Sequence, residues 1–528
     1  MKVLLAIALA AAAIAAASPE SQRAFPDGTY RYEMRLGGRP IGSSTMVVSR
    51  SGGILTVGES ASLAGAALVT QRTIEEPAFS TISYRTNAGG PVVVTVLGNE
   101  ARLTHGESST KISAAPSAPF FVSDNMAAGF AQIPATLHAT GEQQLTMACV
   151  CGTFLALPVH VLAGQDAARP AGVPARDAVV AVSMEGATAT LWYDPQTYVL
   201  DRLDLPSQAF AIVLQSYDSA IVPLPQPVVP TPVPLPAPRY AARDVSIVAG
   251  DGVTLAGTLT MPAAAATPLP GFVFVHGSGC IDRDESVGPN KIFAQLANRL
   301  SNDGYAVLRY DKRSCGKSGG TFPTRDRLIA DALDAVAYLR SQPGIDPTRI
   351  FALGHSEGGE LVPSVAIADK KLRGIVLLAP PALPLERILM QQALRNATPA
   401  DRATIARQEQ AQIDAIAQGK KSGAGAAWLR SSFGIDPASL IARVPPPILI
   451  VQGGKDIQVL EADMPHLVQA ARSANRRVTV VVLPNDDHLF ITLPPGVAST
   501  GAEYFVPSYL DPALFAAIES WLATAGRI

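Results

Sequence analysis

The stretch Gly354-His355-Ser356-Glu357-Gly358-Gly359 directly follows the apolar run Arg349-Ile350-Phe351-Ala352-Leu353. The apolar run predicts a buried β-strand, and residues 360–368 have the composition of a helix. A G-x-S-x-G sequence between a strand and a helix is typical of a sharp turn that lifts the serine hydroxyl above the sheet. Glycine suits this turn because a side chain would block the close approach of the backbone. Ser356 is therefore a candidate nucleophile, and an ordinary glycine-rich turn is the alternative.

Apolar strands alternate with helices on both sides of this turn, after a hairpin at 245–260. Further strands are predicted at 271–275, 305–310, 374–378, 447–451 and 478–483, and helices at 292–303, 325–341 and 512–525. Continuous β-branched runs separated by helices predict a mostly parallel sheet covered on both faces. The fold class expected for residues 240–528 is therefore α/β.

A long polar and helical stretch separates the strands at 374–378 and 447–451. It is too long for a plain connection between a helix and a strand. We therefore expect an inserted helical cap at about 382–440, lying over the site. A solvent-facing helical excursion without function is the alternative.

The part of the chain before residue 240 has a different organisation. Residues 24–220 contain short β-rich runs separated by Gly, Asn and Asp turns, which predicts a separate antiparallel β-rich domain. Residues 221–239 are rich in proline and predict an extended linker between two folded regions. Residues 1–17 combine Lys2, an apolar run and a small-residue end, which is typical of a secretory signal peptide. We therefore expect an exported protein, periplasmic or extracellular, with a membrane anchor as the alternative.

Composition excludes several functional classes. The chain has 528 residues and a net charge of −2, so its charge favours neither nucleic acid nor an anionic membrane surface. It has four cysteines, and none lies at metal-ligand spacing from a histidine or another cysteine. No metal and no organic cofactor are therefore expected.

A serine nucleophile needs a base, and the base needs a carboxylate that orients it. Only two of the seven histidines, His466 and His488, follow Ser356. His466 falls inside a predicted helix, whereas His488 lies in a polar loop directly after the strand at 478–483. Asp456 follows the strand at 447–451 and should reach the same edge of the sheet. We expect His488 as base and Asp456 as its acid; Asp486 and Asp487 are rivals, interpreted as loop stabilisers.

Acyl transfer also requires hydrogen-bond donors for the developing oxyanion. One is expected to be the backbone N–H of Glu357, the residue after the nucleophile. The other is expected from the loop His276-Gly277-Ser278-Gly279, which follows the strand at 271–275, with the N–H of Ser278 as donor. The hydroxyl of Ser278 is a less favoured second nucleophile.

These motifs, in this order, give residues 240–528 a resemblance to the α/β-hydrolase superfamily. The resemblance is to its serine esterases of the dienelactone-hydrolase-like and acyl-hydrolase branch. The motifs that carry it are the 276–279 loop, Asp282-Arg283-Asp284-Glu285, Gly288-Pro289-Asn290-Lys291, Tyr310-Asp311-Lys312-Arg313, the 354–359 turn, Gly453-Gly454-Lys455-Asp456 and Asp487-His488. The likeness implies Ser356 as nucleophile, Asp456 as acid and His488 as base. Dienelactone hydrolases proper have a cysteine nucleophile, so the serine here favours ester hydrolysis.

Two further features lie near the predicted site. Cys280 and Cys315 follow the ends of two strands that are neighbours in such a fold, so we expect a disulfide beside the oxyanion loop; two small buried thiols are the alternative. The loop charges are interpreted as a solvated ion-pair network that fixes the loop, with a substrate-binding role as the lesser alternative; they are Asp282, Arg283, Asp284, Glu285 and Lys291.

The resulting expectation is a secreted serine hydrolase that cleaves a small or medium carboxylic ester through an acyl-enzyme. An acyl thioesterase is the near alternative. A non-catalytic envelope protein that contacts lipid or a partner through the β-rich domain is the alternative from another class. The natural substrate, the role of residues 24–220 and the oligomeric state do not follow from the sequence.

Overall fold

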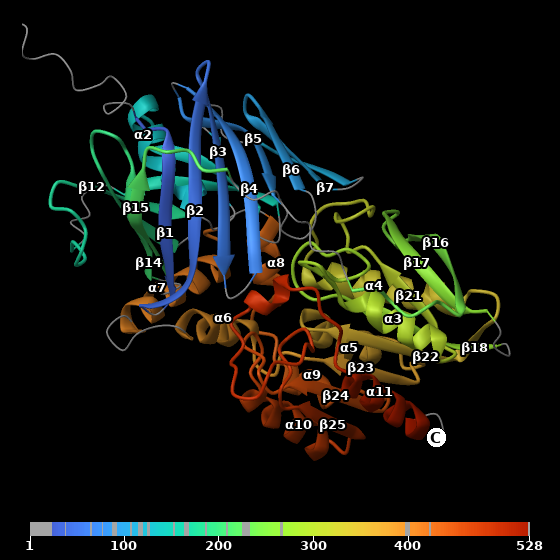
Figure 1. Cartoon of the computed structure of the whole chain (residues 1–528). Coiled ribbons are helices and arrows are strands. Elements are labelled where there is room, and N and C mark those ends of the chain that lie inside the picture. Colours follow the sequence, from blue (N-terminus) through green and yellow to red (C-terminus); the bar gives the residue numbers. More distant parts are fainter. Residues whose placement is uncertain are drawn as a thin grey trace, which may run out of the picture.

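Two β-sheets, each with its own core, make up the molecule (Figure 1). The predicted signal peptide, residues 1–17, and the middle of the predicted linker lie outside the described residues. The computed structural model describes residues 24–525 except 37, 64–65, 77, 87–91, 106–107, 114–119, 124–126, 151–153, 163–167, 185–186, 207–209, 224–232, 264–267, 396–401 and 422–423.

The first sheet contains fifteen of the described strands and is almost wholly antiparallel. Its spatial order runs from β8 down to β1 and then from β15 down to β9, so the first and last strands of the region pair at its centre. The strands are β1 (Gly28–Leu36), β2 (Arg39–Ser51), β3 (Ile54–Leu63), β4 (Ala66–Glu75), β5 (Ser80–Thr86), β6 (Val92–Leu97), β7 (Glu100–His105), β8 (Ser108–Ser113), β9 (Phe120–Ser123), β10 (Gln144–Val150), β11 (Phe154–Leu162), β12 (Ala178–Met184), β13 (Ala187–Tyr193), β14 (Leu200–Leu205) and β15 (Phe210–Asp218).

Two short helices, α1 (Ala127–Ala131) and α2 (Ile133–Thr140), contribute to the core of this sheet and were not expected from the sequence. α2 has a proline in its first turn and ends at Gly141 in the left-handed conformation, which are both helix signals. Burial of Phe130 and Ile133 among strand side chains adds to the stability of the two helices. Local signals and tertiary packing therefore act together at this point of the chain.

The second sheet has eight strands in the order β16-β17-β21-β18-β22-β23-β24-β25. The hairpin β16–β17 is antiparallel, β17 pairs antiparallel with β21, and the six strands from β21 to β25 in that order are parallel. The strands are β16 (Tyr240–Val248), β17 (Thr254–Pro262), β18 (Leu269–Val275), β21 (Ala306–Tyr310), β22 (Ile345–His355), β23 (Gly374–Leu378), β24 (Ile448–Gly453) and β25 (Val478–Leu483); β19 (Ser286–Val287) and β20 (Asn290–Lys291) pair apart from it.

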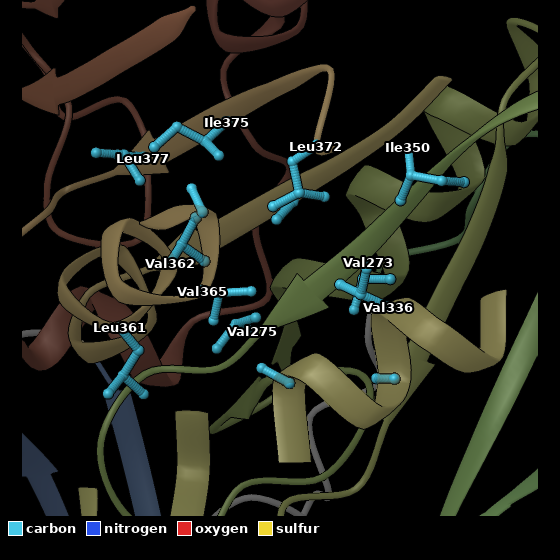
Figure 2. Packing of buried hydrophobic residues seen from close by; sticks show 14 of the residues in the cluster. Val273, Val275, Val336, Ile350, Leu361, Val362, Val365, Leu372, Ile375 and Leu377 are labelled. Carbon is cyan, nitrogen blue, oxygen red and sulfur yellow. The ribbon is translucent and has the colours of Figure 1, made fainter. Parts of the chain in front are cut away.

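Helices cover both faces of this sheet and give it two cores. Figure 2 shows one of them, where Val273 and Ile350 of the strands pack with Val336 of α4 and Val362 of α5. The opposite face packs against α3 and α11, with Phe293 and Trp521 buried. The covering helices are α3 (Ile292–Asn302), α4 (Arg325–Arg340), α5 (Glu357–Ala368), α10 (Met464–Ser473) and α11 (Pro512–Ala525).

Four helices lie in the chain between β23 and β24, in the stretch expected to form a cap. They are α6 (Leu385–Leu394), α7 (Arg402–Ala417), α8 (Ala424–Ser432) and α9 (Pro437–Ile441). In Figure 1 the antiparallel sheet lies above α6 and α7, and the eight-stranded sheet extends to the right of these helices and below them. Strand β4 also contacts the short helix η3 (Ala502–Phe505).

The predicted fold class is confirmed: a mostly parallel, helix-covered sheet with a helical insertion follows a separate antiparallel β-rich region. The parallel strands end at one edge, so the loops after β18, β22, β24 and β25 gather there. Those loops carry the candidate site residues. Within the described residues, no helix has the length and apolar character needed to cross a lipid bilayer.

Candidate active site

Ser356 occupies a strained turn between β22 and α5. Its backbone has φ 53° and ψ −122°, a conformation that residues with a side chain rarely adopt. The flanking glycines make the turn possible. A Cβ on Gly358 would lie 2.0 Å from the carbonyl oxygen of Val275, and one on Gly354 would lie 2.1 Å from that of Gly358. The turn therefore has no room for side chains at these two positions.

Asp456 and His488 meet at the same edge of the sheet. The ring nitrogen Nδ1 of His488 lies 2.7 Å from Oδ2 of Asp456, and both side chains are buried. Burial raises the pKa of Asp456, but the His488 charge and hydrogen bond, with the amides of Val459 and Gln458, outweigh it and lower the pKa. Asp456 is therefore ionised and accepts a hydrogen bond from the Nδ1–H of His488. The other ring nitrogen, Nε2, is left for a proton from a reacting group.

The rival carboxylates Asp486 and Asp487 are placed differently. Asp487 accepts hydrogen bonds from the backbone amides of Leu489 and Ile491, and Asp486 accepts one from the hydroxyl of Thr492. Both carboxylates therefore hold the loop around His488 in shape. His466 lies in the first turn of α10 and is exposed to solvent.

The loop after β18 places the backbone of residues 277 and 278 beside the nucleophile. A Cβ on Gly277 would lie 3.3 Å from Cβ of Ser356. The amide of Gly277 donates to Oε1 of Glu285 at 2.6 Å and is not available to a substrate. The amides of Ser278 and Glu357 donate to no described residue, and both residues line the cavity at Ser356. Two unused donors thus remain at the position where an oxyanion would need them.

His276 begins the same loop and is neutral. Its burial and the neighbouring charge of Lys312 lower its pKa to about 4. The ring nitrogen Nε2 contacts the carbonyl oxygen of Tyr310, to which it donates. His276 therefore holds the loop against the end of β21 and cannot act as a base from there.

His355 and Glu285 join the loops around Ser356, and sequence reasoning missed this role. Nδ1 of His355 lies 3.1 Å from Oε1 of Glu285, and Nε2 lies 2.9 Å from the carbonyl oxygen of His488. Both side chains are buried. Burial lowers the pKa of His355, but the charge and hydrogen bond of Glu285 outweigh it, so the pKa is raised. A protonated ring satisfies both oxygen acceptors and links the nucleophile turn to the His488 loop.

The expectation of a solvated ion-pair network around residues 282–291 is therefore wrong for Glu285. The residue is only 2 % exposed, because the loop folds inward and its carboxylate caps the amide of Gly277. The expectation describes Lys291 and Asp284 better, since their 3.3 Å ion pair lies at the surface. An alternation of charges in the sequence does not reveal which one turns inward.

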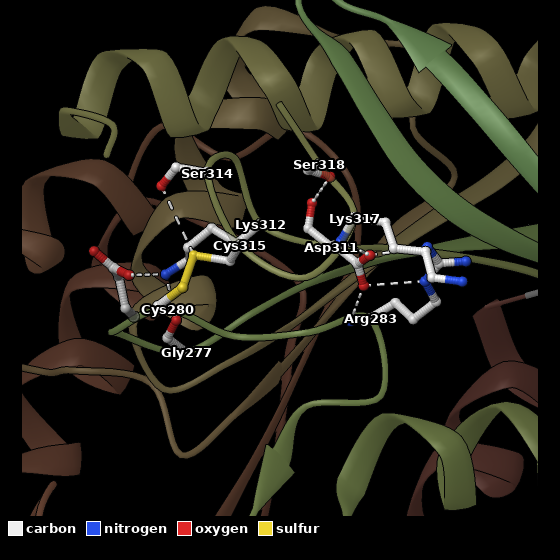
Figure 3. Close-up of a disulfide and its surroundings, with 10 residues drawn as sticks. Gly277, Cys280, Arg283, Asp311, Lys312, Ser314, Cys315, Lys317 and Ser318 are labelled. Atoms are coloured by element: carbon white, nitrogen blue, oxygen red, sulfur yellow. Dashed lines mark hydrogen bonds and ion pairs between the residues drawn. A yellow bond between two sulfur atoms is a disulfide. The ribbon is translucent and has the colours of Figure 1, made fainter. Parts of the chain in front are cut away.

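Figure 3 shows the second support of the oxyanion loop, beside a disulfide. The structure joins Cys280 and Cys315, with a Cα–Cα distance of 5.4 Å. Next to this bridge, Nζ of Lys312 donates to the carbonyl oxygen of Gly277 at 2.6 Å and to Oε2 of Glu357 at 2.9 Å. The segment after β21 is thus tied to the oxyanion loop by a covalent bond and by an ammonium group.

A cavity of about 160 Å³ opens at Ser356 beneath the helices between β23 and β24. Its wall is mostly apolar, and one cap residue is tied to the turn: Nε1 of Trp428 donates to Oε1 of Glu357 at 2.6 Å. The lining comprises Ser278, Ser356, Glu357, Glu360, Pro381, Leu383, Leu385, Ile388, Leu389, Gln392, Trp428, Ser432, Ile435, Pro437, Gln458 and Val459. Across the described part of the chain, no group of three or more His, Cys, Asp or Glu side chains is arranged to hold a metal ion.

Comparisons with known proteins find similarity in the C-terminal half of the chain. Residues 272–500 match the model of the alpha/beta hydrolase family. Esterase EstD of Thermotoga maritima is 34% identical over 275 residues, which cover 51% of this chain and 65% of that esterase. Thiohydrolase aneE of Aspergillus aculeatus is 33% identical over 141 residues, 26% of this chain and 41% of the thiohydrolase. The matches thus span less than two thirds of either relative.

Among solved structures, Est1E from Butyrivibrio proteoclasticus is similar over 54% of this chain and 99% of its own, with a TM-score of 0.37 and 16% sequence identity.

Proposed function

From the similarity of residues 272–500 to the alpha/beta hydrolase family and from the similarity to an esterase, we propose that this chain is a member of that family and an exported serine esterase that cleaves short-chain carboxylic esters. The observation that carries the proposal is the 2.7 Å contact between His488 and Asp456 beside the strained turn of Ser356. Acyl transfer requires a nucleophile, a base and an acid that orients the base. Three loops at one sheet edge carry candidates for these three roles. The similarity to an esterase supports the same reaction class.

The proposed reaction has two acyl-transfer steps. Oγ of Ser356 attacks the ester carbonyl carbon while Nε2 of His488 takes the hydroxyl proton, and Asp456 stabilises the imidazolium. The amides of Ser278 and Glu357 donate to the oxyanion. The tetrahedral intermediate collapses, His488 returns the proton to the leaving alkoxide, and an alcohol departs. Water, deprotonated by His488, then attacks the carbonyl carbon of the acyl-enzyme. The bond from that carbon to Oγ of Ser356 breaks, His488 returns the proton to Oγ, and the acid is released.

The cavity sets the expected size of the acyl group. It measures about 160 Å³ and its wall includes Leu383, Ile388 and Val459. An apolar cavity of about 150 Å³ in another protein binds benzene, so this one suits an acyl chain of about six carbon atoms.

Export is proposed from the character of residues 1–17.

The first prediction concerns the nucleophile. Ser356→Ala should lower kcat for p-nitrophenyl butyrate by about 10⁴-fold or more, because the covalent intermediate can no longer form. The measurement is a panel of p-nitrophenyl esters from two to twelve acyl carbons, with purified wild type and variant. Ser432→Ala, which removes another hydroxyl in the same cavity, is the matched control and should keep its activity.

Two results would contradict parts of the proposed function. Activity that survives Ser356→Ala and is lost in Ser278→Ala would move the nucleophile to the oxyanion loop. A wild type that hydrolyses no ester of any length would favour the alternative of a lipid- or partner-binding envelope protein. The similarity to a thiohydrolase makes a thioesterase the second candidate function. Acyl thioesters of matched chain length in the same panel decide between the two by the ratio of the kcat/KM values for ester and thioester.

A further inference from the structure

Lys312 is a buried ammonium group at the oxyanion loop. Its side chain is 3 % exposed, and no other lysine in the described ranges is buried. Burying a lysine is costly unless its charge is paired and its protons are donated. Lys312 meets both conditions through two acceptors, the carbonyl oxygen of Gly277 at 2.6 Å and Oε2 of Glu357 at 2.9 Å. Both acceptors belong to residues that shape the oxyanion site.

The contact with Gly277 acts on the amide of Ser278 through the peptide bond. The carbonyl of one residue and the N–H of the next share one plane and, in a trans peptide, point in opposite directions. An ammonium that fixes the Gly277 carbonyl therefore also fixes the direction of the Ser278 N–H. It withdraws electron density from the oxygen as well, which makes that N–H a stronger donor.

The same loop is held on its other side. The amide of Gly277 donates to Oε1 of Glu285 at 2.6 Å, so opposite charges hold the two ends of this residue. The disulfide between Cys280 and Cys315 holds the loop against the segment that carries Lys312 (Figure 3). The peptide before Ser278 thus has little freedom to rotate.

The contact with Glu357 brings in the second donor. Glu357 contributes its backbone amide at the start of α5, while its carboxylate accepts from Lys312 and from Trp428. One ion pair therefore connects the loop of the first donor, the helix of the second donor and the cap. A purely structural ion pair has no need to contact both donor segments.

We propose that Lys312 is a positioning residue that orients and polarises the oxyanion site through the carbonyl of Gly277. The proposal rests on the proposed function, in which the amides of Ser278 and Glu357 bind the oxyanion of an ester substrate. An interaction made to the oxyanion acts in the transition state, so its loss lowers kcat and leaves KM nearly unchanged. Loss of a merely structural ion pair changes stability instead.

The test compares three variants of the full-length protein. Lys312→Met alone leaves Glu357 unpaired, so the main variant is the double substitution Lys312→Met with Glu357→Gln, which removes both charges. We expect its kcat for p-nitrophenyl butyrate to fall 10- to 100-fold with KM within threefold of wild type. Glu357→Gln alone keeps the contact between Lys312 and Gly277 and measures what the change at position 357 contributes, so the double variant should have a kcat at least threefold lower than that of this single variant. Lys291→Met, which removes a surface ion pair from the same region, is the control and should stay within twofold.

Inhibitor binding gives a second readout that does not depend on turnover. A trifluoromethyl ketone with a butyl chain forms a tetrahedral oxyanion adduct with a serine, whereas butyrate, the product acid, does not. In the double variant the ketone should lose affinity by the same 10- to 100-fold, and butyrate should bind within threefold of wild type. Circular dichroism and thermal melting establish that each variant is folded at the assay temperature.

The outcomes separate this proposal from the proposed function. A folded double variant with kcat and ketone affinity within threefold of wild type overturns the role of Lys312. A Glu357→Gln variant that loses as much as the double variant assigns the effect to Glu357 and overturns it too. If the double variant does not fold, the test rests on the kcat of Glu357→Gln and on the affinity of Lys312→Arg for the ketone. An arginine at position 312 that reaches the carbonyl of Gly277 should bind the ketone as the wild type does. If the wild type has no esterase activity, or if Ser356→Ala is active, the proposed function is refuted, whatever the result for Lys312.

Discussion

Single buried charges hold the geometry around Ser356. His355 shows this most clearly, because its ring lies between the carboxylate of Glu285 and the carbonyl oxygen of His488. Two loops 133 residues apart in the chain thereby share one side chain. Burying the charges of His355 and Glu285 costs free energy, and three hydrogen bonds offset this cost. Two are made by the His355 ring, and the third is donated by the amide of Gly277 to Glu285. The result is a nucleophile turn and a base loop that move together.

Asp487 makes the stability of the protein depend on pH. Burial raises its pKa to about 7, above the ordinary 3.8, although the amides of Ile491 and Leu489 oppose the shift. The folded state therefore holds this proton more tightly than the unfolded chain does. Its contribution to stability is complete below about pH 4 and is lost as the pH rises through 7.

Asp487→Asn should weaken this dependence, because asparagine keeps an oxygen acceptor for the loop and carries no charge. Between pH 5 and pH 8 we expect the free energy of unfolding of the variant to fall by about 1–3 kcal/mol less than that of wild type. Urea denaturation at both pH values measures it. Asp326→Asn, at an exposed aspartate on α4, is the control. Equal falls in wild type and Asp487→Asn would contradict the prediction.

At the scale of elements, helix α8 closes the cavity over the turn. Trp428 is tied to Glu357 by its indole N–H, packs edge-on against Phe322 at 6.5 Å, and is the largest side chain in the cavity wall. The cap is therefore connected to the first turn of α5, and the side chain at position 428 limits the space for the acyl group.

Trp428→Ala should shift acyl preference to longer chains. Removing the indole enlarges a cavity of about 160 Å³, so esters longer than about six acyl carbons should gain relative to butyrate. We expect the ratio of kcat/KM for the ten-carbon and four-carbon p-nitrophenyl esters to rise about tenfold or more. Trp428→Phe, which keeps an aromatic wall, is the control. An unchanged ratio in Trp428→Ala would place the acyl chain elsewhere.

The whole molecule has separate cores for its two sheets. The buried cluster with Tyr30, Phe121 and Phe130 belongs to the antiparallel region, and the clusters with Val273 and Phe272 belong to the eight-stranded sheet. Regions that do not share a core can unfold independently.

Two thermal transitions are therefore expected for the whole chain in differential scanning calorimetry. A phosphonate ester that reacts with Ser356 should raise only the transition of the eight-stranded region, because a ligand stabilises the state that binds it. The same scan with Ser356→Ala and the phosphonate is the control and should show no shift. One cooperative transition, or a shift of both, would show that the two regions are energetically coupled.

The sequence determined a large part of this architecture by itself. Helices expected at 325–341 and 512–525 appear as Arg325–Arg340 and Pro512–Ala525. Such agreement is physical, because apolar periodicity and turn glycines act locally along the chain. The same holds for Ser356, Asp456 and His488. Each of them follows a predicted strand, and the structure brings them to one sheet edge, with Asp456 and His488 in contact.

Tertiary structure alone decided which charges turn inward. Nothing local distinguishes Glu285 from Asp284, or Lys312 from Lys317, as the member of its pair that is buried at the oxyanion loop. Their roles depend on loops 35 to 70 residues apart meeting at the ends of parallel strands. Helices α1 and α2, which were not predicted from the sequence, likewise pack against an apolar surface that the strands provide. Local patterns specify elements and candidate chemistry, whereas the close contacts that orient the site arise only when distant segments pack together.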